Sequence, residues 1–322
     1  MKRELVAVDL GGTHARFALA TIDDGGTIRL DPPTTFQTAE HASFQTAWQA
    51  YGKSLGRPLP RGAAIAIAGP VHGEVIRMTN NPWIIRPALI RDKLDVDDFV
   101  LVNDFEAIGH AVAKAAPDEF IPLCGPEGPL PAGLVSIVGP GTGMGVAALT
   151  LSGDSYRVQA TEGGHVDFAP LDVIEDAILA RLRQRHRRVS AERVVSGPAI
   201  VDIYETLASL ERRKIRLASD REIWAAGIDG DDSLAAAAVD RFCLSLGSFA
   251  GDIALAQGAS AVVIAGGLGL RLKEALGRSG FAERFRSKGR FEQMMAGLPV
   301  KLIVHPQPGL FGAAAAFAQA HP

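Results

Sequence analysis

Near its beginning the chain reads Val6-Ala7-Val8-Asp9-Leu10-Gly11-Gly12-Thr13-His14-Ala15-Arg16-Phe17-Ala18-Leu19. An apolar run, a Gly-Gly-Thr turn and a second apolar run predict two strands joined by a tight hairpin. A similar pattern returns 129 residues later as Ser136-Ile137-Val138-Gly139-Pro140-Gly141-Thr142-Gly143-Met144-Gly145-Val146-Ala147-Ala148. So short a match also arises by chance. If it is a true repeat, two similar domains each present one glycine hairpin to a shared cleft.

Length and glycine content agree with two domains. The chain has 322 residues, whereas one domain has roughly 150. Its 35 glycines are about 11% of the residues, against an average of about 7%. Since no collagen period or low-complexity tract contains them, the surplus predicts places where the backbone turns sharply or approaches a ligand closely.

Apolar runs that alternate with helical patterns predict an α/β fold. The expected strands are Leu5–Val8, Ala63–Ala68, Phe99–Val102, Leu134–Val138, Val146–Leu151, Ala261–Ala265 and Val300–Val304. The expected helices are Phe44–Lys53, Asp104–Ala115, Leu171–Arg187, Gly197–Leu210, Ser233–Gln257 and Leu310–Ala320.

Charge and cysteine content exclude several classes of function. The 33 Lys and Arg against 36 Asp and Glu leave a net charge of −3, which argues against a broad cationic face for nucleic acid or anionic lipid. Two cysteines, Cys124 and Cys243, are too few for a disulfide framework or a multi-cysteine zinc site. Asp9 interrupts the first apolar stretch, and Gly and Pro break the uncharged segment 128–153. We therefore expect a cytoplasmic protein with no nucleic acid and no membrane as partner.

The first glycine turn suggests a phosphate site. Glycines let several backbone N–H groups converge on one anion, as Gly11, Gly12 and Thr13 would here. Asp9 stands just before the turn, where a carboxylate beside phosphates calls for a cation between them. Mg²⁺ is the natural choice, because it is commonly shared by a carboxylate and phosphates. The alternative is an ordinary hairpin with a solvated aspartate.

Two further polar groups suggest a polyhydroxyl ligand. Asn103-Asp104 follows an apolar strand, at the end where α/β sheets bind ligands. Glu162, His165 and Asp167 follow the second hairpin. Carboxylates accept hydrogen bonds from hydroxyls, while amide and imidazole groups donate to them. Taken singly, the Asp would more often be a helix N-cap and the second group a polar turn.

Two better-known phosphate motifs are incomplete. Gly52-Lys53-Ser54 has the tail of a P-loop, but Ala47 stands where its first glycine belongs. Gly143-Met144-Gly145-Val146-Ala147-Ala148 fits a lenient dinucleotide pattern, which has to open a helix, yet the residues after it favour a strand. A nicotinamide dehydrogenase is therefore a weaker hypothesis.

Together these motifs resemble the bacterial glucokinase family, of the ATP-dependent, non-repressor type, within the actin-like/hexokinase ATPase superfamily. The resemblance is collinear over essentially the whole chain, and the Glu162–Pro170 block and the Glu192–Pro198 segment are its most specific parts. It runs through Asp9–Thr13, Ala68-Gly69-Pro70, Thr79-Asn80-Asn81-Pro82-Trp83, Leu101–Phe105, Gly139–Gly143, Glu162–Pro170, Glu192-Arg193, Ser196-Gly197-Pro198 and Gly266-Gly267.

The resemblance implies a two-domain actin-like (ribonuclease H-like) ATPase fold with a cleft between the domains. A small domain would span residues 1–108 and 307–322, and a large domain residues 109–306. The implied activity is transfer of the γ-phosphoryl group of ATP to the 6-hydroxyl of D-glucose, the first step of glycolysis. Mg-ATP would be the cofactor, glucose and ATP the small-molecule partners, and a homodimer the expected assembly.

The resemblance also implies a role for each matching residue. Asp104 would be the base that accepts the proton of the 6-hydroxyl. The residues that hydrogen-bond the sugar would be Asn103, Asp104, Glu162, His165 and Glu192. The phosphate loops would be Gly11, Gly12 and Thr13 with Gly141, Thr142 and Gly143. Asp9 would lie near Mg²⁺, which it would hold through water, and Gly266 and Gly267 would flank the adenosine.

Some features depart from the family or have simpler explanations. His14 stands where the family usually has Asn, which puts the pH dependence of the phosphate loop in doubt. Trp83 is expected in the core or at a hinge rather than under a sugar. The arginines between Arg181 and Arg188 are expected to form a solvated helix end. A broader hexose kinase and a non-catalytic sugar sensor on the same fold stay open as alternative functions.

Overall fold

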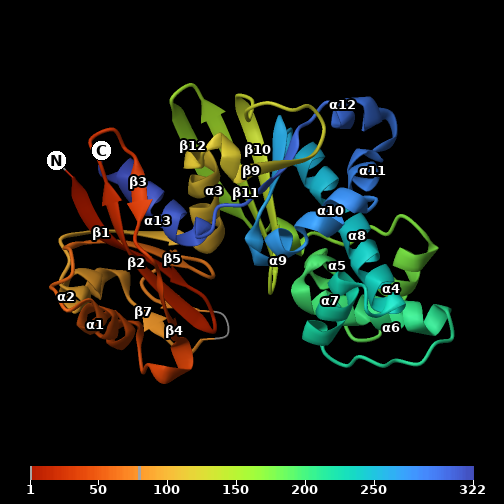
Figure 1. Cartoon of the computed structure of the whole chain (residues 1–322), viewed down its shortest axis with the longest axis horizontal. Helices are drawn as coiled ribbons and strands as arrows, with labels where there is room; N and C mark the ends of the chain where they lie inside the picture. The colour runs from red at the N-terminus through yellow and green to blue at the C-terminus, as the bar shows by residue number, and fades with distance from the viewer. Residues whose placement is uncertain (1, 79–80) are drawn as a thin grey trace. The chain divides into compact units, whose positions relative to one another are not determined.

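The described residues form two six-stranded sheets, each with parallel strands at its centre and with its own helices, and one small two-stranded sheet (Figure 1). The structure is a computed structural model that describes residues 2–78 and 81–322. It divides the chain into two units, Met1–Ala115 with His305–Pro322 and Ala116–Val304. The predicted boundary at residue 108 falls inside helix α3 (Asp104–Lys114). All of α3 belongs to the first unit, because it packs along α13 (Pro308–Ala320).

The first unit is built on a sheet with the strand order β3-β2-β1-β5-β8, and β4 pairs with β2. Strands β1, β5 and β8 are parallel, whereas β2 runs antiparallel to β1. Its elements before α3 are β1 (Arg3–Leu10), β2 (His14–Ile22), β3 (Ile28–Leu30), β4 (Thr34–Gln37), η1 (Thr38–Glu40), α1 (Phe44–Leu55), β5 (Gly62–Ile67), β6 (Ile76–Arg77), β7 (Ile84–Ile85), η2 (Pro87–Leu89), α2 (Ile90–Leu94) and β8 (Asp98–Asn103).

The second unit has the strand order β12-β11-β10-β13-β14-β9. Its first elements are η3 (Pro117–Glu119), β9 (Phe120–Cys124), β10 (Gly133–Pro140), β11 (Met144–Ser152), β12 (Ser155–Thr161), η4 (Gly163–His165), α4 (Val173–Arg183), α5 (Glu192–Val195), η5 (Gly197–Ala199) and α6 (Ile200–Leu210). They are followed by α7 (Asp220–Asp229), α8 (Ser233–Gln257), β13 (Ala261–Ile264), α9 (Gly266–Arg271), α10 (Lys273–Arg278), α11 (Phe281–Arg286), η6 (Gly289–Phe291), α12 (Glu292–Ala296) and β14 (Val300–Ile303).

The internal repeat is present in the topology. In each unit a central strand, β1 or β10, ends in a glycine hairpin and pairs antiparallel with the next strand. Its other edge pairs in parallel with β5 or β13. The strands and helices expected from the sequence are present, with two differences: α4 is shorter than the predicted Leu171–Arg187, and the predicted helix Gly197–Leu210 is divided into the 3₁₀ helix η5 and α6.

Small residues join the helices of the first unit. Gly312 of α13 lies so close to the carbonyl of Ala107 in α3 that no side chain would fit between the two backbones. Leu310, Ala313 and Phe317 bury the other side of α13 among strand residues such as Leu5 and Val102. This packing fixes where α13 begins.

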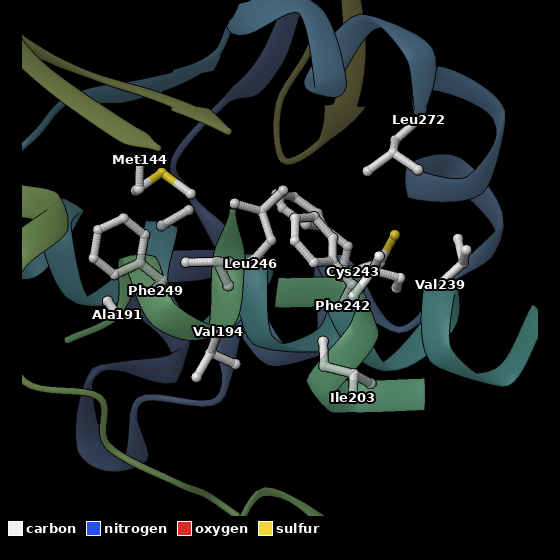
Figure 2. Close-up of a cluster of buried hydrophobic side chains, with 14 of the residues drawn as sticks. Met144, Ala191, Val194, Ile203, Val239, Phe242, Cys243, Leu246, Phe249 and Leu272 are labelled. Atoms are coloured by element: carbon white, nitrogen blue, oxygen red, sulfur yellow. The ribbon is translucent and has the colours of Figure 1, made fainter. Parts of the chain in front are cut away.

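The second unit has a larger apolar core around α8 (Figure 2). Phe242, Cys243 and Leu246 of α8 are fully buried there, and Trp224 packs edge-on against Phe242 at 4.9 Å between ring centroids. By length and hydropathy α8 resembles a membrane span, but 72% of its apolar window is buried inside the unit. It is therefore placed as a core helix, and the uncharged stretch 128–153 forms the β10–β11 hairpin.

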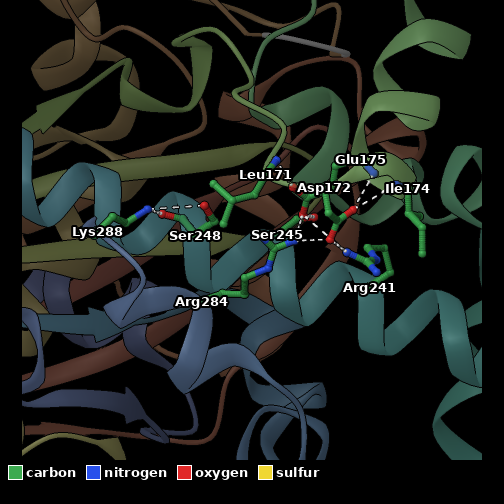
Figure 3. Close-up of polar contacts among 9 residues, drawn as sticks. All are labelled: Leu171, Asp172, Ile174, Glu175, Arg241, Ser245, Ser248, Arg284 and Lys288. Atoms are coloured by element: carbon green, nitrogen blue, oxygen red, sulfur yellow. Dashed lines mark hydrogen bonds and ion pairs between the residues drawn. The ribbon is translucent and has the colours of Figure 1, made fainter. Parts of the chain in front are cut away.

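A buried ion network ties α4 to α8 and α11 (Figure 3). Glu175 is fully buried and accepts hydrogen bonds from Ser245 Oγ at 2.9 Å and from the backbone N–H of Leu171 at 2.7 Å. Arg284 reaches Glu175 at 3.0 Å and Asp172 at 2.7 Å. Because the buried Glu175 accepts from the backbone N–H of Leu171, this network holds the chain directly after the Glu162–Pro170 block.

Candidate functional site

One edge of the first sheet collects the polar residues of the first unit. Leu10, Ile67 and Asn103 are level with one another in the parallel strands β1, β5 and β8. Asp9 precedes Leu10, and Asp104 follows Asn103. Strand neighbours lie about 4.8 Å apart, so β1 and β8 deliver their polar ends to the same edge, where α/β sheets bind ligands.

The carboxylate of Asp9 lies between the guanidinium of Arg16 and the first turn of α13. Its strand partner across the hairpin is Arg16, whose guanidinium donates to Asp9 Oδ2 at 3.2 Å. A Cβ atom built on Gly309 would lie 2.9 Å from the same oxygen, so the carboxylate lies against the first turn of α13. Burial raises the pKa of Asp9, and the charge of Arg16 opposes that shift. The sequence predicted Mg²⁺ near Asp9 but not its contacts with Arg16 and Gly309.

The first glycine turn is held by its backbone and keeps its tip in solvent. Gly11 N–H donates to the carbonyl of His14 at 2.9 Å, and Thr38 Oγ1 donates to the carbonyl of Gly12 at 2.8 Å. Thr13 and His14 are exposed. The His14 ring is 3.1 Å from Gln37 Nε2, its strand partner on β4. The turn is therefore preformed around Gly11, Gly12 and Thr13.

Asn103, rather than Asp104, caps helix α3. Asn103 Oδ1 accepts from the backbone N–H groups of Phe105 at 2.8 Å and Glu106 at 3.2 Å, and its Nδ2 donates to the carbonyl of Gly69 at 3.0 Å. Asp104 is the first helical residue, and its Oδ1 accepts from Phe105 N–H at 3.0 Å. The simpler explanation, that Asp104 is the cap, is therefore wrong. The amide of Asn103 carries two hydrogens, so one remains to donate beyond Gly69.

The side chain of Glu192, from helix α5, contacts the second glycine hairpin. Its Oε2 accepts from the backbone N–H of Met144 at 2.9 Å, and a Cβ on Gly143 would lie 2.5 Å from it. The carbonyl of Gly141 accepts from Gly197 N–H at 2.7 Å, which ties the Ser196–Pro198 turn to the same hairpin. The structure thus brings Glu192, expected only near the sugar, onto the loop Gly141, Thr142 and Gly143.

The Glu162–Asp167 block lies beside that hairpin. Gly163 and Gly164 pack on Val146 and Met144 of β11, with no room for a side chain at Gly164. Both Glu162 and His165 are exposed, and the His165 ring lies 3.8 Å from Glu162 Oε2. Backbone hydrogen bonds Phe168 N–H to Val189 O (3.0 Å) and Ala191 N–H to Val166 O (2.8 Å) join this block to the segment before Glu192. These hydrogen bonds therefore join the segments that carry Glu162, His165 and Glu192, three of the residues predicted to bind the sugar.

Gly266 and Gly267 begin α9 directly after β13. Gly266 has a φ of 82° and lies against the carbonyl of Pro140, 2.8 Å from where its Cβ would be. A side chain there would be strained and crowded. Gly267 faces open space. The two glycines therefore lie beside the end of β10, next to the second hairpin.

No cluster of three metal-ligating side chains occurs in the part of the chain that the structure describes. Mg²⁺ does not require one, because it is usually bound by one or two carboxylates together with substrate phosphates and water. A single carboxylate, Asp9, before a glycine turn fits a cation carried by a nucleotide.

Several simpler interpretations can be decided from the structure. Trp83 is 2% exposed, donates to the carbonyl of His41 and packs near Phe44, so it belongs to the core. Arg181 and Arg185 pair with Asp202 at and just after the end of α4, whereas Arg188, further along the chain, pairs with Asp167 and donates to the carbonyl of His165. In the Thr79–Trp83 motif, Thr79 and Asn80 lie outside the described residues.

The segment Gly143–Ala148 lies at the second hairpin and in β11. It does not begin a helix, which removes the structural basis for a dinucleotide site.

Comparison with known proteins places this architecture in a family. The Glucokinase family model matches residues 5–320. A glucokinase of Zymomonas mobilis subsp. mobilis is 58% identical over 316 residues, 98% of each chain. One of Caulobacter vibrioides is 40% identical over 96% of this chain and 93% of its own. The crystal structure of a glucokinase from an Antarctic psychrotroph has a TM-score of 0.85 at 31% identity, and the alignment covers 98% of this chain and 99% of that one. These similarities confirm the two-domain actin-like kinase fold, and the chain belongs to the glucokinase family.

Proposed function

We propose that this chain is an ATP-dependent glucokinase that transfers the γ-phosphoryl group of ATP to the 6-hydroxyl of D-glucose. The observation that carries the proposal is the pair Asn103-Asp104 at the edge of the first sheet. Asn103 takes the capping role, so the neighbouring carboxylate is positioned by the helix start without being its cap. That arrangement suits a base held rigidly at a ligand-binding edge.

Asp104 is the base of this reaction. Its carboxylate accepts the proton of the 6-hydroxyl as that oxygen bonds to the γ-phosphorus. The bond from the γ-phosphorus to the bridging oxygen breaks, and ADP leaves with the electron pair. Phosphoryl transfer demands positioning and charge neutralisation more than covalent participation by the protein. One base and preformed loops are therefore enough.

Four polar side chains in addition to Asp104 are proposed to recognise the sugar. Asn103 donates through its second amide hydrogen, while Glu162, His165 and Glu192 hydrogen-bond ring hydroxyls. The exposure of Glu162 and His165 leaves them able to exchange water for hydroxyls. Glu192 accepts from Met144 N–H with Oε2, and a carboxylate has further lone pairs for a hydroxyl.

The nucleotide phosphates bind the two glycine loops, Gly11–Thr13 and Gly141–Gly143, and the adenosine lies by Gly266 and Gly267. Asp9 is the residue that would hold Mg²⁺ through water, and the cation would neutralise charge on the phosphates. Arg16 orients the Asp9 carboxylate. Mg²⁺ dependence, a homodimer and a cytoplasmic location remain predictions for this chain.

Replacement of the proposed base tests this function. Asp104→Asn should retain glucose binding and lose about 10²–10⁴-fold in kcat, measured by coupled ADP release and by calorimetry with glucose. Asp220→Asn is a matched control, because Asp220 also begins a helix and accepts from the next backbone N–H, at 2.7 Å. Near-normal kcat in Asp104→Asn would exclude the role.

A hexose and donor panel separates the alternatives. Phosphorylation of glucose well above mannose, glucosamine and fructose supports a glucokinase, and equal rates would indicate a broader hexose kinase. Tight glucose binding without turnover of Mg-ATP or polyphosphate would indicate a sugar sensor. No sugar-dependent ADP release and no glucose binding would exclude the proposal altogether.

A further inference from the structure

The first turn of α13 makes an unusually close contact with Asp9. A Cβ on Gly309 would lie 2.9 Å from Asp9 Oδ2 and 3.0 Å from its Cγ. Carbon atoms of real side chains do not approach so closely, so any residue other than glycine at position 309 would have to displace something. Either α13 moves or the carboxylate turns.

The helix is the less movable of the two. Pro308 fixes the backbone at the first position of α13. One turn further on, Gly312 is in direct backbone contact with Ala107 of α3. Leu310, between them, is 1% exposed in the core. Moving α13 would disrupt this packing, whereas the Asp9 side chain only has to rotate.

On its other side, the Asp9 carboxylate is bounded by Arg16. The guanidinium donates to Oδ2 at 3.2 Å from the neighbouring strand β2. A carboxylate with a cation on one side and the first turn of a helix on the other has few orientations open to it. Helix N-termini also favour negative charge, which strengthens the contact from the α13 side.

We infer that Gly309 is a positioning residue for Asp9. Because Gly309 has no side chain, the first turn of α13 can lie directly against the Asp9 carboxylate and restrict its orientation. The inference rests on the proposed function for the role of Asp9 toward Mg²⁺. It assigns part of the nucleotide site to the C-terminal helix, about 300 residues along the chain from the phosphate loop. Gly309 is proposed to act only through Asp9, without contact to the metal or the nucleotide.

Gly309→Ala tests it, with Gly277→Ala as the matched control. Gly277 lies in helix α10 with open space where its Cβ would be, so the same substitution meets no neighbour there. In Gly309→Ala we expect the Mg²⁺ concentration for half-maximal activity to rise at least tenfold. Mn²⁺ binding in the presence of ADP, measured by electron paramagnetic resonance, should weaken by a similar factor. Gly277→Ala should change neither, and values equal in the two variants would overturn the inference.

A double-mutant cycle covers the case in which Gly309→Ala folds poorly. Asp9→Ala removes the carboxylate that the new methyl group would meet. Any loss of melting temperature caused by Gly309→Ala in the native background should therefore shrink to within about 2 °C in the Asp9→Ala background. An equal loss in both backgrounds would show that Gly309 acts on the fold rather than through Asp9, and would overturn the inference.

The same experiments separate this inference from the proposed function. If the native chain neither phosphorylates glucose nor binds Mn²⁺ with ADP, the proposed function fails. The stability cycle still reports on the contact between Gly309 and Asp9. If the native chain is active and Mn²⁺ binding is unchanged by Gly309→Ala, only the positioning role fails.

Discussion

The two glycine hairpins occupy equivalent places in their sheets and obtain their carboxylates in different ways. Asp9 belongs to the strand that leads into the first hairpin, and its partner Arg16 stands directly across on β2. At the second hairpin the corresponding strands pair Gly139 with Gly145, and neither carries a charge. Its carboxylate, Glu192, comes from the short helix α5. The ion pair of the first carboxylate thus lies within its own hairpin, whereas the second hairpin receives its carboxylate from another element by tertiary packing.

This difference predicts different sensitivities. Both hairpins are paired by their backbones over eight residue pairs. In the first, the Asp9–Arg16 ion pair joins two residues that this pairing already places opposite each other, so losing the ion pair should leave the shape of the hairpin intact. In the second hairpin, the backbone N–H of Met144, the first residue of β11, donates a hydrogen bond to the side chain of Glu192 in α5. Changes at Glu192 should therefore act on the hairpin as well as on the sugar binding proposed for this residue.

Glu192→Ala should have the largest effect of the tests that follow. The carboxylate accepts from Met144 N–H, and hydrogen bonds to charged groups are worth about 1.5–3 kcal/mol. Loss of kcat/KM for both glucose and ATP should therefore be about 10- to 150-fold. Glu192→Gln, which keeps an oxygen for Met144 N–H, should affect glucose more than ATP. The assay is steady-state kinetics with each substrate varied.

Glu283→Ala serves as the control, because Glu283 is an exposed residue of a short helix, α11, in the same unit. An effect of Glu192→Ala confined to glucose would show that the second hairpin holds its shape without the carboxylate. Backbone pairing alone would then be enough to hold the second hairpin, as expected for the first.

The first unit should also lose stability at mildly acidic pH because of His110. This side chain is 5% exposed, and burial lowers its pKa to about 4. Between pH 6.5 and 4 the unfolded chain binds more protons at this position, so the free energy of unfolding falls as the pH falls. The contribution lost between pH 7 and 5 is about 2 kcal/mol. Urea unfolding at both pH values should show this loss, and His110→Gln should remove it.

His72→Gln is the control, since His72 is exposed in the same unit. Tryptophan fluorescence can show where the loss occurs, because Trp48 and Trp83 lie in the first unit and Trp224 in the second. An equal pH dependence in His110→Gln and the native chain would contradict the assignment. Acid sensitivity caused by His110 would then not distinguish the two units, and only their hairpins would.

Features that depend on neighbouring residues were predictable from the sequence. The alternation of apolar runs and glycine turns predicts both hairpins, and Asp9 and Asn103-Asp104 are found at strand ends as expected. Contacts between distant segments were not predictable, since no local pattern records them. Gly309 against Asp9 and Glu192 against Met144 depend on how helices pack on sheets. Asn103 as the cap was missed because either residue of the Asn-Asp pair is a good N-cap.

Arg16→Gln should have the smallest effect and tests the local character of the first hairpin most directly. Arg16 and Asp9 are 3.2 Å apart, with side chains 48% and 22% exposed, and such pairs contribute about 0–1 kcal/mol. We expect urea unfolding at 50 mM NaCl to show a loss below about 1 kcal/mol, and a smaller one in 1 M NaCl because salt screens the pair. Arg57→Gln, which breaks an exposed pair with Glu4 in the same unit, should behave similarly. A loss of several kcal/mol confined to Arg16→Gln would mean that the ion pair, not the β1–β2 backbone pairing, holds the first hairpin. The first hairpin would then depend on the contact of its carboxylate with Arg16, as the second is expected to depend on the contact of Glu192 with Met144.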